Sequence, residues 1–441
     1  MENISVFLDR MKSLLGSEFD AFLEYYNSGK VFRGIRVNTL KCSCEKLKSI
    51  IGFELKSTPF CKEGFYLPEE IVSIGNNPLH HAGAFYVQEP SAASAVEMLG
   101  VKEGDKVLDL CAAPGGKSTQ IASKLNGKGF LWSNEIVKSR ANILLSNIER
   151  MGIKNAVVSS CRPDILCEKL GGYFDKILVD APCSGEGMFR KNSEAQSEWS
   201  VEHVKSCAQR QLNILNSAKY ALKGGGELVY STCTFSYEEN EGVITEFLEQ
   251  NPEFSVVDSG VIFGRPTLEY ARRIFPMDGG EGHFAVKLRK DADTVSVPDI
   301  KREACKIPDF VYEFYDNSFK DETLRGNLEI IGKNIYAGFY IPDTRGLNIL
   351  RKGVLIGEIK KNRVEPAHHI FMTLNKESCN RAVDLDINGK EIKNFLHGEE
   401  IEVSPSLKGY TVVCVNGITT GFGKASGGRL KNKYPKGLRT L

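Results

Sequence analysis

The stretch Asp109-Leu110-Cys111-Ala112-Ala113-Pro114-Gly115-Gly116-Lys117-Ser118 decides the fold class of this chain. The apolar run that begins at Val107 and ends at Cys111 is long enough for one buried parallel strand. Pro114 and the two glycines after it predict a turn, and residues 117–125 predict a helix. Glycines let the backbone approach a ligand, and the unpaired N–H groups of a helix N-terminus face it. The stretch therefore predicts a binding site for a charged small molecule.

Predicted strands and helices alternate through residues 99–290. The strands are expected at 105–111, 130–135, 156–159, 174–180 and 228–233, and the helices at 117–125, 138–151, 201–222 and 238–250. The glycines at 224–226 are expected to end the third helix, and residues 271–290 to hold a final antiparallel pair. This alternation predicts an α/β fold with a Rossmann-like core, a mostly parallel sheet with helices on both faces. Ligands of such sheets bind beyond the carboxyl ends of the strands.

The flanking segments predict further domains. Residues 1–98 form an N-terminal extension that is expected to be helical up to about residue 30. The basic, β-branched stretch from Arg33 to Lys41 follows, and an exposed strand edge is its simplest explanation. Polar residues 291–308 predict a linker, 309–385 a small domain, and 386–441 a strand-rich domain with glycine turns. Its basic residues, with no acid after Glu402, indicate either a solvated end or a surface that contacts phosphates.

Composition excludes several classes of protein. The 441 residues carry a net charge of +1, with 41% hydrophobic and 26% charged residues, as in ordinary globular proteins. We find neither a run of about eighteen apolar residues, as a membrane span needs, nor a secretory signal at the start. The 12 cysteines contain no C-x-x-C pair, which argues against a zinc ribbon or another metal site, a thioredoxin motif and a disulfide scaffold. We infer a cytoplasmic location, where free thiols persist.

Three predicted strand ends bring candidate ligand-binding residues together. The loop from Asp109 to Lys117 follows the first strand, Glu135 ends the second and Asp180 ends the fourth. An acid at the end of the second strand suits a ribose diol. A phosphate-binding P-loop needs glycine where Cys111 stands, and the dinucleotide pattern G-x-G-x-x-G is absent. A nucleoside cofactor with few phosphate contacts remains, and S-adenosylmethionine fits that description.

Two cysteines follow adjacent strand ends on the same edge. The fourth strand leads into Asp180-Ala181-Pro182-Cys183-Ser184-Gly185, and the fifth into Ser231-Thr232-Cys233-Thr234. Free cysteines are often merely buried structural thiols, but two at this edge beside an aspartate indicate chemistry. A thiolate that adds to carbon 6 of cytosine makes carbon 5 nucleophilic, and an acid such as Asp180 with a raised pKa helps by protonating N3. A second thiol can assist the release, and this reasoning leaves the roles of the two cysteines open.

These motifs resemble the Nol/Nop/Sun family of RNA cytosine-5 methyltransferases. The similarity covers roughly residues 30–290, in the segments 33–40, 86–91, 109–118, 180–190, 231–240 and 282–284. It implies that S-adenosylmethionine contacts Cys111, Ala112, Ala113, Pro114, Gly115, Gly116, Lys117, Glu135 and Asp180. It also implies that Cys233 is the nucleophile, that Cys183 releases the product, and that Asp180 is the acid at N3. Members of this family commonly have an acid near the adenine after the third strand. At that place this chain has the stretch from Ser159 to Asp164, with Cys161 or Arg162 at the expected position.

The C-terminal third is similar to that of the bacterial RsmF type, with a small linking domain and a PUA-like RNA-binding end. This similarity implies that the partner is 16S rRNA of the small ribosomal subunit, with a target base flipped out of the RNA for attack. We expect a monomer, and Arg36, Lys41, Arg190, Lys191 and the basic tail as phosphate contacts. Two alternatives stay open: a non-catalytic RNA-binding assembly factor, and a cytosine-5 methyltransferase that acts on tRNA or DNA.

Overall fold

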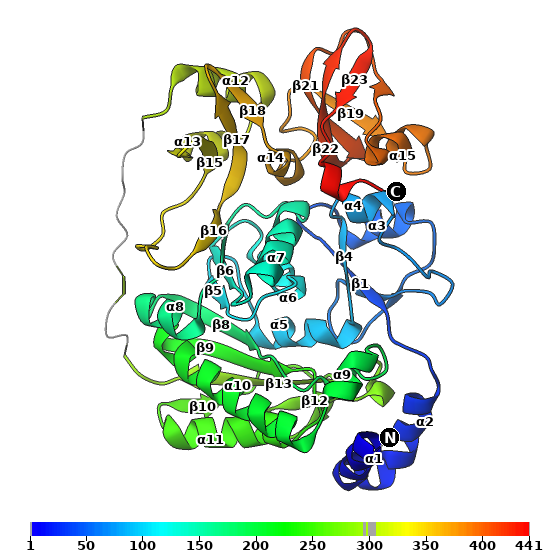
Figure 1. Ribbon diagram of the computed structural model, residues 1–441, viewed down its shortest axis with the longest axis vertical. Helices are drawn as coiled ribbons and strands as arrows, with labels where there is room; N and C mark the ends of the chain where they lie inside the picture. Colours follow the sequence, from blue (N-terminus) through cyan, green and yellow to red (C-terminus); the bar gives the residue numbers. More distant parts are fainter. Residues whose placement is uncertain (1, 294–296, 299–305, 441) are drawn as a thin grey trace.

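The structure is a computed structural model that describes residues 2–293, 297–298 and 306–440. A large sheet with helices on both faces forms the centre of the molecule in Figure 1. A helical hairpin at the N-terminus lies at the lower end of that view, and two small C-terminal domains lie at the upper end. The predicted linker at 291–308 falls largely outside the described residues.

Five parallel strands form the middle of the central sheet, in the order β9-β8-β5-β6-β7. They are β5 (Lys106–Asp109), β6 (Phe130–Asn134), β7 (Ala156–Ser159), β8 (Phe174–Asp180) and β9 (Leu222–Thr232). Beyond β9 the sheet continues antiparallel through β13 (His283–Lys290), β12 (Arg272–Ile274) and β11 (Arg265–Pro266), and β10 (Phe254–Val256) pairs with β13. This arrangement confirms the predicted α/β fold with a mostly parallel sheet and a final antiparallel pair.

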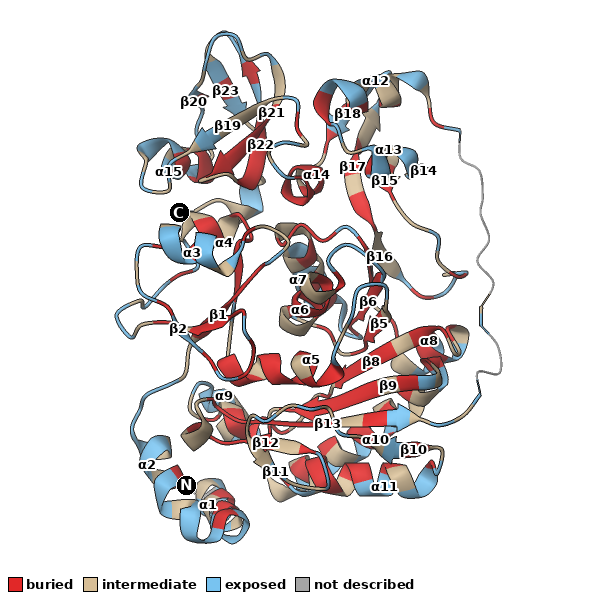
Figure 2. Cartoon of the chain, turned by 180° about the vertical axis from the view of Figure 1, so that it is seen from behind, coloured by how far each residue is buried: buried red, intermediate tan, exposed pale blue. Residues whose placement is uncertain are grey.

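Helices cover both faces of this sheet because successive strand residues point to opposite sides. On β5, Val107 packs in one apolar cluster with α5 (Ser94–Leu99), α6 (Gly116–Leu125) and α7 (Lys138–Arg150). Leu108 packs in the other, with α8 (Pro163–Lys169), α10 (Val201–Ala221) and α11 (Val243–Gln250). Figure 2 shows the strands between these layers as largely buried. No helix within the described ranges is both long and apolar enough to cross a bilayer.

The expectation that glycines 224–226 end a helix is wrong. Helix α10 ends at Ala221, and β9 begins at the next residue and continues through the glycines. Against β8 the register passes from Phe174 opposite Leu222 to Lys176 opposite Glu227, so the glycines form a bulge. Gly225 has φ +72°, a conformation that side chains disfavour, which explains the glycine there.

The N-terminal extension contains a helical pair and a small sheet. Its elements are α1 (Glu2–Leu15), α2 (Phe19–Asn27), β1 (Gly34–Val37), α3 (Cys44–Ile50), β2 (Lys56–Ser57), β3 (Gly64–Tyr66), α4 (Pro78–His81) and β4 (Phe85–Gln88). Strand order is β2-β3-β1-β4, so β1 is an interior strand with all four residues buried, and the predicted exposed edge is wrong. Arg36 on β1 donates to the Gly116 carbonyl at 2.7 Å and to Thr119 Oγ1 at 2.7 Å. It braces the loop that starts α6, and its predicted contact with phosphate is wrong because the side chain is buried.

The C-terminal part contains two small sheets with order β14-β15-β17-β18 and β19-β21-β22-β23-β20. The first domain comprises α12 (Asp309–Ser318), α13 (Glu322–Gly326), β14 (Leu328–Ile331), β15 (Asn334–Ala337), β16 (Ile349–Lys352), β17 (Val354–Lys360), β18 (Arg363–Pro366) and α14 (His368–Thr373). The second comprises β19 (Ala382–Leu385), α15 (Lys390–His397), β20 (Ile401–Glu402), β21 (Gly409–Val415), β22 (Ile418–Ser426) and β23 (Arg429–Asn432). Strand β16 pairs antiparallel with β7, so the first of these domains completes one edge of the central sheet.

Lys41 connects the N-terminal extension to both C-terminal domains. Its Nζ donates to the Met372 carbonyl and, at 2.8 Å, to Thr419 Oγ1. Burial lowers the pKa of Lys41 to about 7. The predicted phosphate contact of Lys41 is therefore wrong, since the ammonium group is enclosed between domains.

Gly152 lies at the same junction and provides a test of how tightly it is packed. A Cβ at Gly152 would lie 2.4 Å from the Met372 carbonyl oxygen and 2.9 Å from Lys41 Cε, whereas one at Gly127 would meet nothing within 4 Å. Because φ is +71° and +73°, alanine at either position carries a left-handed cost of about 1–2 kcal/mol. Gly152→Ala adds a clash of about 1–3 kcal/mol. We expect it to lower the Tm several degrees further than Gly127→Ala in thermal unfolding. Equal losses in the two variants would show that the junction is loosely packed.

Candidate active site

A cavity of about 240 Å³ lies where the loops after β4, β5 and β8 meet. It is lined by Tyr86, Val87, Gln88, Glu89, Ala92, Asp109, Cys111, Ala112, Ala113, Pro114, Gly116, Lys117 and Asp180. Seven of the nine residues expected to bind the cofactor are among them, and Gly115 and Glu135 are not. Residues 86–89 were not predicted as ligand contacts, although the similar segment 86–91 was the signal that could have indicated them.

Two glycines allow the loop to pass through a narrow space. Gly115 has φ +114° at the N-terminus of α6, and a Cβ there would lie 3.1 Å from Leu144 Cδ1 of α7. A Cβ at Gly116 would lie 3.3 Å from Gln88 Oε1 and 3.3 Å from the Tyr86 ring. Larger residues would push the loop away from β4 and α7, so the glycines keep the helix N-terminus at the cavity.

Asp109 forms the buried end of the cavity. Its Oδ2 accepts a hydrogen bond of 2.6 Å from Ser118, and burial raises the pKa of Asp109 to about 7. Its Oδ1 is buried without a hydrogen-bond partner among the residues that the structure describes. A buried acceptor is stable only when a donor reaches it. The arrangement therefore fits a ligand with an ammonium or other N–H group, such as the amino-acid part of S-adenosylmethionine.

Glu135 lies directly behind the loop. Its Oε1 accepts from the Val137 amide at 2.9 Å, and its Oε2 pairs with Arg140 at 3.3 Å. Arg140 also donates to the Ala113 carbonyl at 3.0 Å, which connects Glu135 to the cavity wall. The charge of Glu135 contributes to the raised pKa of Asp109, after the larger effect of burial. Its contact with a ribose stays a prediction.

Lys117 and Asp180 form an ion pair across the cavity, with 2.7 Å between Nζ and Oδ2. Ser231 donates to Asp180 Oδ1 at 2.8 Å. Burial alone would raise the pKa of Asp180, but the charge of Lys117 and the hydrogen bonds from Lys117 and Ser231 lower it overall. The predicted raised pKa is therefore wrong for the free protein, in which Asp180 is ionised.

His283 was not predicted as a site residue, although it lies on β13 beside the strand that carries Ser231. Its Nε2 is 3.9 Å from Asp180 Oδ1, and its side chain is buried. Burial and the neighbouring Lys117 lower the pKa of His283 to about 3, so the ring is neutral at physiological pH. Its proximity follows from the antiparallel register of β13 and β9, and the similar segment 282–284 was the signal that could have indicated it.

The structure brings the two predicted cysteines together, with 3.2 Å between the sulfur atoms of Cys183 and Cys233. Both thiols are half-buried. The hydrogen bond with Cys233, burial and the nearby Glu239 raise the pKa of Cys183 well above its usual value. Cys111 lies in the loop before α6, and burial and the surrounding acids raise the pKa of its thiol well above its usual value, so the thiol is neutral.

The remaining predicted basic contacts, Arg190 and Lys191, both lie near one buried acid, Glu281. Arg190 Nε lies 3.6 Å from Glu281 Oε2, and its side chain is 7% exposed. Lys191 Nζ lies 3.6 Å from the other oxygen of Glu281 and donates to the Phe32 carbonyl. The predicted phosphate contact of Arg190 is wrong because its side chain is buried against Glu281, whereas Lys191 is exposed and its contact with phosphate stays a prediction. In the stretch from Ser159 to Asp164, which stands where related proteins have an acid near the adenine, Asp164 pairs with Arg162 at 2.7 Å. Asp164 lies outside the cavity lining.

The parallel sheet, the glycine turn before α6 and the acids at the strand ends define a class of protein, the S-adenosylmethionine-dependent methyltransferases. Four family profiles match the chain in order. They are the N-terminal domain of 16S rRNA methyltransferase RsmF (residues 5–90), 16S rRNA methyltransferase RsmB/F (96–289), the RsmF first C-terminal domain (313–374) and the RsmF PUA domain (382–440).

Full-length relatives and solved structures agree with these matches. Ribosomal RNA small subunit methyltransferase F of Vibrio vulnificus is 33% identical over 98% of this chain and 96% of its own length. The protein of the same name from Vibrio atlanticus is 34% identical over the same shares. A methyltransferase homolog from Pyrococcus horikoshii is 32% identical, with a TM-score of 0.58 over 65% of this chain and 94% of that chain. NSun6 from the same organism, solved with SFG, is 25% identical, with a TM-score of 0.59 over 65% and 98%.

The chain therefore belongs to the RsmF family of 16S rRNA methyltransferases. This membership confirms the predicted resemblance and the enzyme class, an S-adenosylmethionine-dependent cytosine-C5 methyltransferase of ribosomal RNA. The individual ligand contacts and the roles of the cysteines stay predictions, as do the domain boundaries.

The raised pKa of Asp109 predicts how stability depends on pH. The folded-state pKa of about 7 exceeds the unfolded value near 3.9, so the folded state holds a proton that the unfolded chain releases. The contribution of this proton to the free energy of unfolding is fully present below pH ~4. It is lost as the pH rises to ~7, and the loss is at most about 4 kcal/mol. The Asp109→Asn variant has no such loss. In thermal unfolding, we therefore expect the Tm of the variant to rise relative to that of the wild type as the pH increases from ~4 to ~7. A difference that does not change with pH would contradict the buried, proton-holding Asp109.

Proposed function

We propose that this chain methylates carbon 5 of a cytosine in 16S rRNA of the small ribosomal subunit, through a covalent bond between Cys233 and the base. The observation that carries the proposal is the 3.2 Å contact of two half-buried thiols beside Asp180. Methyl transfer to an amine or hydroxyl needs no cysteine, whereas carbon 5 of cytosine needs activation by a nucleophile. The relatives named ribosomal RNA small subunit methyltransferase F support the choice of RNA.

The cavity residues hold the methyl donor. We assign the amino-acid part to the unpartnered Asp109 Oδ1 and the loop from Cys111 to Lys117, and the ribose to Glu135. When bound, S-adenosylmethionine supplies an electrophilic methyl group on its sulfonium. The neutral Cys111 thiol contacts the donor without competing as a nucleophile.

Cys233 and Asp180 act first. The Cys233 thiolate forms a bond to carbon 6, the ring electrons move towards N3, and N3 takes a proton from Asp180. A base that fills the cavity mouth displaces water from Asp180, and this desolvation raises the pKa of the carboxyl so that it can carry the proton. Lys117 and Ser231 hold Asp180 in place. Carbon 5 then has enamine character and accepts the methyl group.

Cys183 completes the reaction. Cys183 first releases its thiol proton to solvent and, as a thiolate, removes the proton from carbon 5. The electron pair re-forms the ring double bond, and Cys233 leaves as a thiolate. N3 returns its proton to Asp180. Asp180 and then Cys233 raise the pKa of Lys117 against the effect of burial, so Lys117 is a cation between the acid and this thiol. Glu239 instead disfavours a thiolate at Cys183, which therefore holds its proton before attack.

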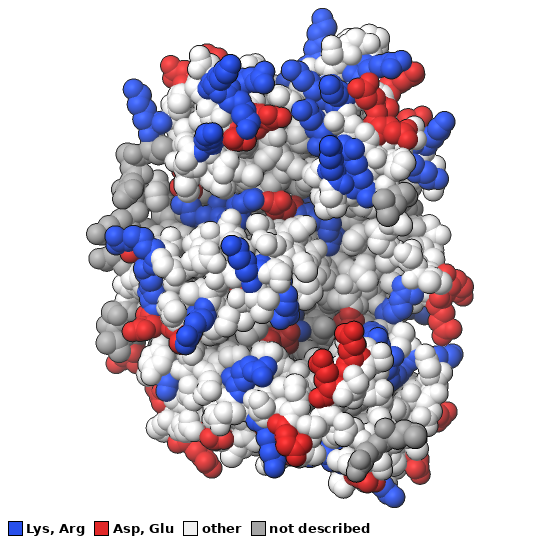
Figure 3. All heavy atoms as spheres, viewed as in Figure 1, with Lys and Arg blue, Asp and Glu red and all other residues white. Residues whose placement is uncertain are grey.

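The RNA surface is assigned to the C-terminal sheet. Lys424 of β22 lies directly opposite Lys431 of β23, and both are exposed. Like charges placed opposite each other on a sheet are unfavourable unless an anion binds them. Figure 3 shows Lys and Arg side chains, with acidic side chains among them, on the upper part of the molecule, where these domains lie. We propose a 386–441 PUA-like RNA-binding domain, a monomer and a cytoplasmic location, as the sequence predicted.

Substitution of either cysteine tests the reaction on small-subunit RNA from cells that lack this protein. We expect Cys183→Ala to accumulate a covalent RNA adduct, because attack by Cys233 still occurs while release is blocked. Cys233→Ala should form no adduct and lose more than about 10³-fold in methyl transfer. Denaturing gel electrophoresis detects the adduct. The transfer of label from tritium-labelled cofactor to the RNA measures methylation.

Cys379 is buried and remote from the cavity, so Cys379→Ala is the control. This variant should transfer methyl groups at the wild-type rate and accumulate no adduct. An adduct in Cys233→Ala and none in Cys183→Ala would reverse the roles. Transfer to duplex DNA and none to small-subunit RNA would contradict the proposed substrate.

Lys424 and Lys431 test the RNA surface. We expect Lys424→Ala and Lys431→Ala each to raise the KM for RNA several-fold and to reduce the salt slope of RNA binding by about one. The affinity for the cofactor should not change, because the sheet lies away from the cavity. Lys205→Ala on α10, at the other end of the molecule in Figure 1, is the matched control. Equal effects of all three substitutions would show that the C-terminal sheet is not the RNA-binding surface.

A further inference from the structure

Glu239 is a buried carboxylate that lies behind both cysteine loops. It belongs to the π-helical turn Glu238–Gly242 that follows β9, and its exposure is 0%. Its Oε2 accepts from the Ser184 amide at 2.9 Å and from Gln211 Nε2 at 2.8 Å, and its Oε1 accepts from the Ser184 hydroxyl. Gln211 also donates to the Pro182 carbonyl at 3.1 Å. The backbone on both sides of Cys183 is thereby held by one carboxylate.

The same network reaches the loop that carries Cys233. The Ser184 hydroxyl lies 3.0 Å from Thr234 Oγ1, and both residues are buried. Ser184 directly follows Cys183, and Thr234 directly follows Cys233. Glu239 therefore joins the two loops at the residues next to the reacting thiols.

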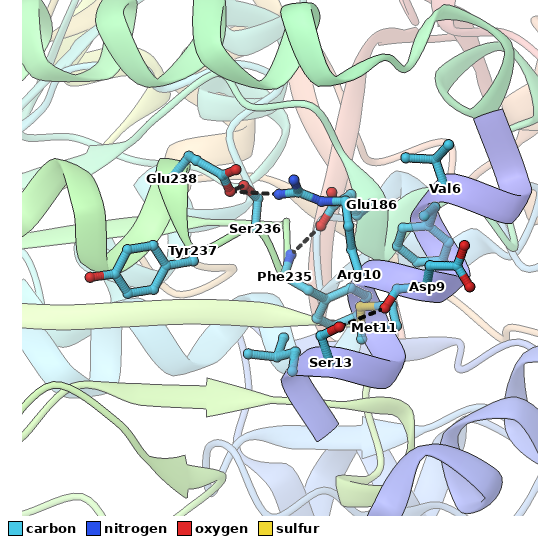
Figure 4. Close-up of a pocket in the computed structure, with 12 residues that line it drawn as sticks. Val6, Asp9, Arg10, Met11, Ser13, Glu186, Phe235, Ser236, Tyr237 and Glu238 are labelled. Carbon is cyan, nitrogen blue, oxygen red and sulfur yellow. Dashed lines mark hydrogen bonds and ion pairs between the residues drawn. The ribbon is translucent and has the colours of Figure 1, made fainter. Parts of the chain in front are cut away.

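The opposite side of the Cys233 loop has its own support. Glu186 accepts from the Phe235 amide at 2.9 Å and from Trp199 Nε1 at 3.0 Å. Figure 4 shows Glu186 pointing at Phe235, with Arg10 of α1 reaching Glu238 at 2.5 Å beside a cavity of about 580 Å³. Glu186 and Gly187 follow Cys183 in the same loop, and the Gly187 amide donates to the Cys233 carbonyl at 2.9 Å, so these contacts also join the two loops. Glu239 adds the connection that runs through Ser184 and Thr234, the residues directly after the thiols.

Glu239 is costly to bury, which argues for a role. No described Lys, Arg or His lies within ion-pair distance of its carboxylate, so hydrogen bonds alone compensate its charge. Burial raises the pKa of Glu239, and the hydrogen bonds from Ser184 and Gln211 oppose this effect. A buried acid with such a cost beside a reactive centre is typical of functional sites.

We propose that Glu239 is a positioning residue that fixes the distance between the thiols of Cys183 and Cys233, so that both reach neighbouring carbons of one bound cytosine. The inference rests on the proposed roles of the two cysteines. Carbons 5 and 6 are bonded to each other, so the thiols that act on them must stay close throughout the reaction. Small displacements of reacting groups slow catalysis strongly.

Oxidation of the two thiols measures their proximity without RNA or cofactor. Each Cys183–Cys233 disulfide forms with the loss of two protons and two electrons, which reduce one oxidised glutathione to two thiols. We expect Glu239→Ala to slow this intramolecular step about tenfold or more, and Glu239→Gln by less than about threefold. Glutamine keeps acceptor capacity towards Ser184, and Gln211 can turn its unpartnered Oε1 to the new amide. Peptide mass spectrometry follows the disulfide.

Kinetics on small-subunit RNA give the second readout. We expect Glu239→Ala to lower kcat about 10–100-fold while the KM for S-adenosylmethionine stays unchanged, because the cofactor loop is elsewhere. In a Cys183→Ala background the rate of adduct formation should fall with Glu239→Ala. Ser184→Ala and Glu239→Ala should be strongly non-additive, because they remove the same connection.

Glu241→Gln is the matched control. Glu241 lies on the same turn, is buried, and binds Arg273 at 2.5 Å, away from the cysteines. It should lower the Tm without slowing disulfide formation. Equal oxidation rates in wild type and Glu239→Ala, or equal slowing by Glu241→Gln, would overturn the inference. If Glu239→Ala slows the disulfide but no variant forms an RNA adduct, the proposed function fails while the positioning role stands.

Discussion

The parallel register of β5, β8 and β9 is the constraint on which the site depends. Asp109 lies opposite Leu178, and Asp180 lies opposite Ser231. Because the strands run in the same direction, the loops that follow them leave the sheet at one edge. A shift by one residue would turn each strand-end side chain to the other face of the sheet. The cofactor loop, the Lys117–Asp180 ion pair and the cysteine contact all follow from this register.

Charge then gives two chemically similar thiols different environments. Lys117 lies at the N-terminus of α6, where its ammonium pairs with Asp180 and interacts with Cys233. Glu239 approaches from the turn after β9, on the side of Cys183. An anion disfavours a thiolate, and Glu239 contributes to the raised pKa of Cys183. The asymmetry comes from two acids and one lysine carried by different elements, so the roles of the cysteines depend on the sheet being folded.

Several basic side chains that the sequence predicted as RNA contacts stabilise the fold instead. Arg36 braces the loop that starts α6, Lys41 joins three domains, and Arg190 pairs with the buried Glu281. A basic residue beside β-branched neighbours has the same local pattern whether it meets phosphate or a carbonyl group. Burial decides between these outcomes, and burial of a β1 residue depends on strands that lie far away in the chain. Lys424 on β22 and Lys431 on β23 are exposed, and they keep the proposed role in RNA binding.

The sequence by itself determined the α/β class and the strand, turn and helix of residues 109–117, and it singled out Cys183 and Cys233 as candidates, because each depends on local periodicity, glycine turns or a short motif. Residues 109–117 predict a strand, a turn and a helix N-terminus wherever they fold, and only glycine suits the φ of +114° at position 115. The tertiary structure alone decided that Asp180 is ionised, that His283 is neutral, and that Glu239 lies behind the thiols. Those properties depend on the distance and burial of groups brought together by sheet register, and Coulomb energies and desolvation are set by that geometry rather than by order along the chain.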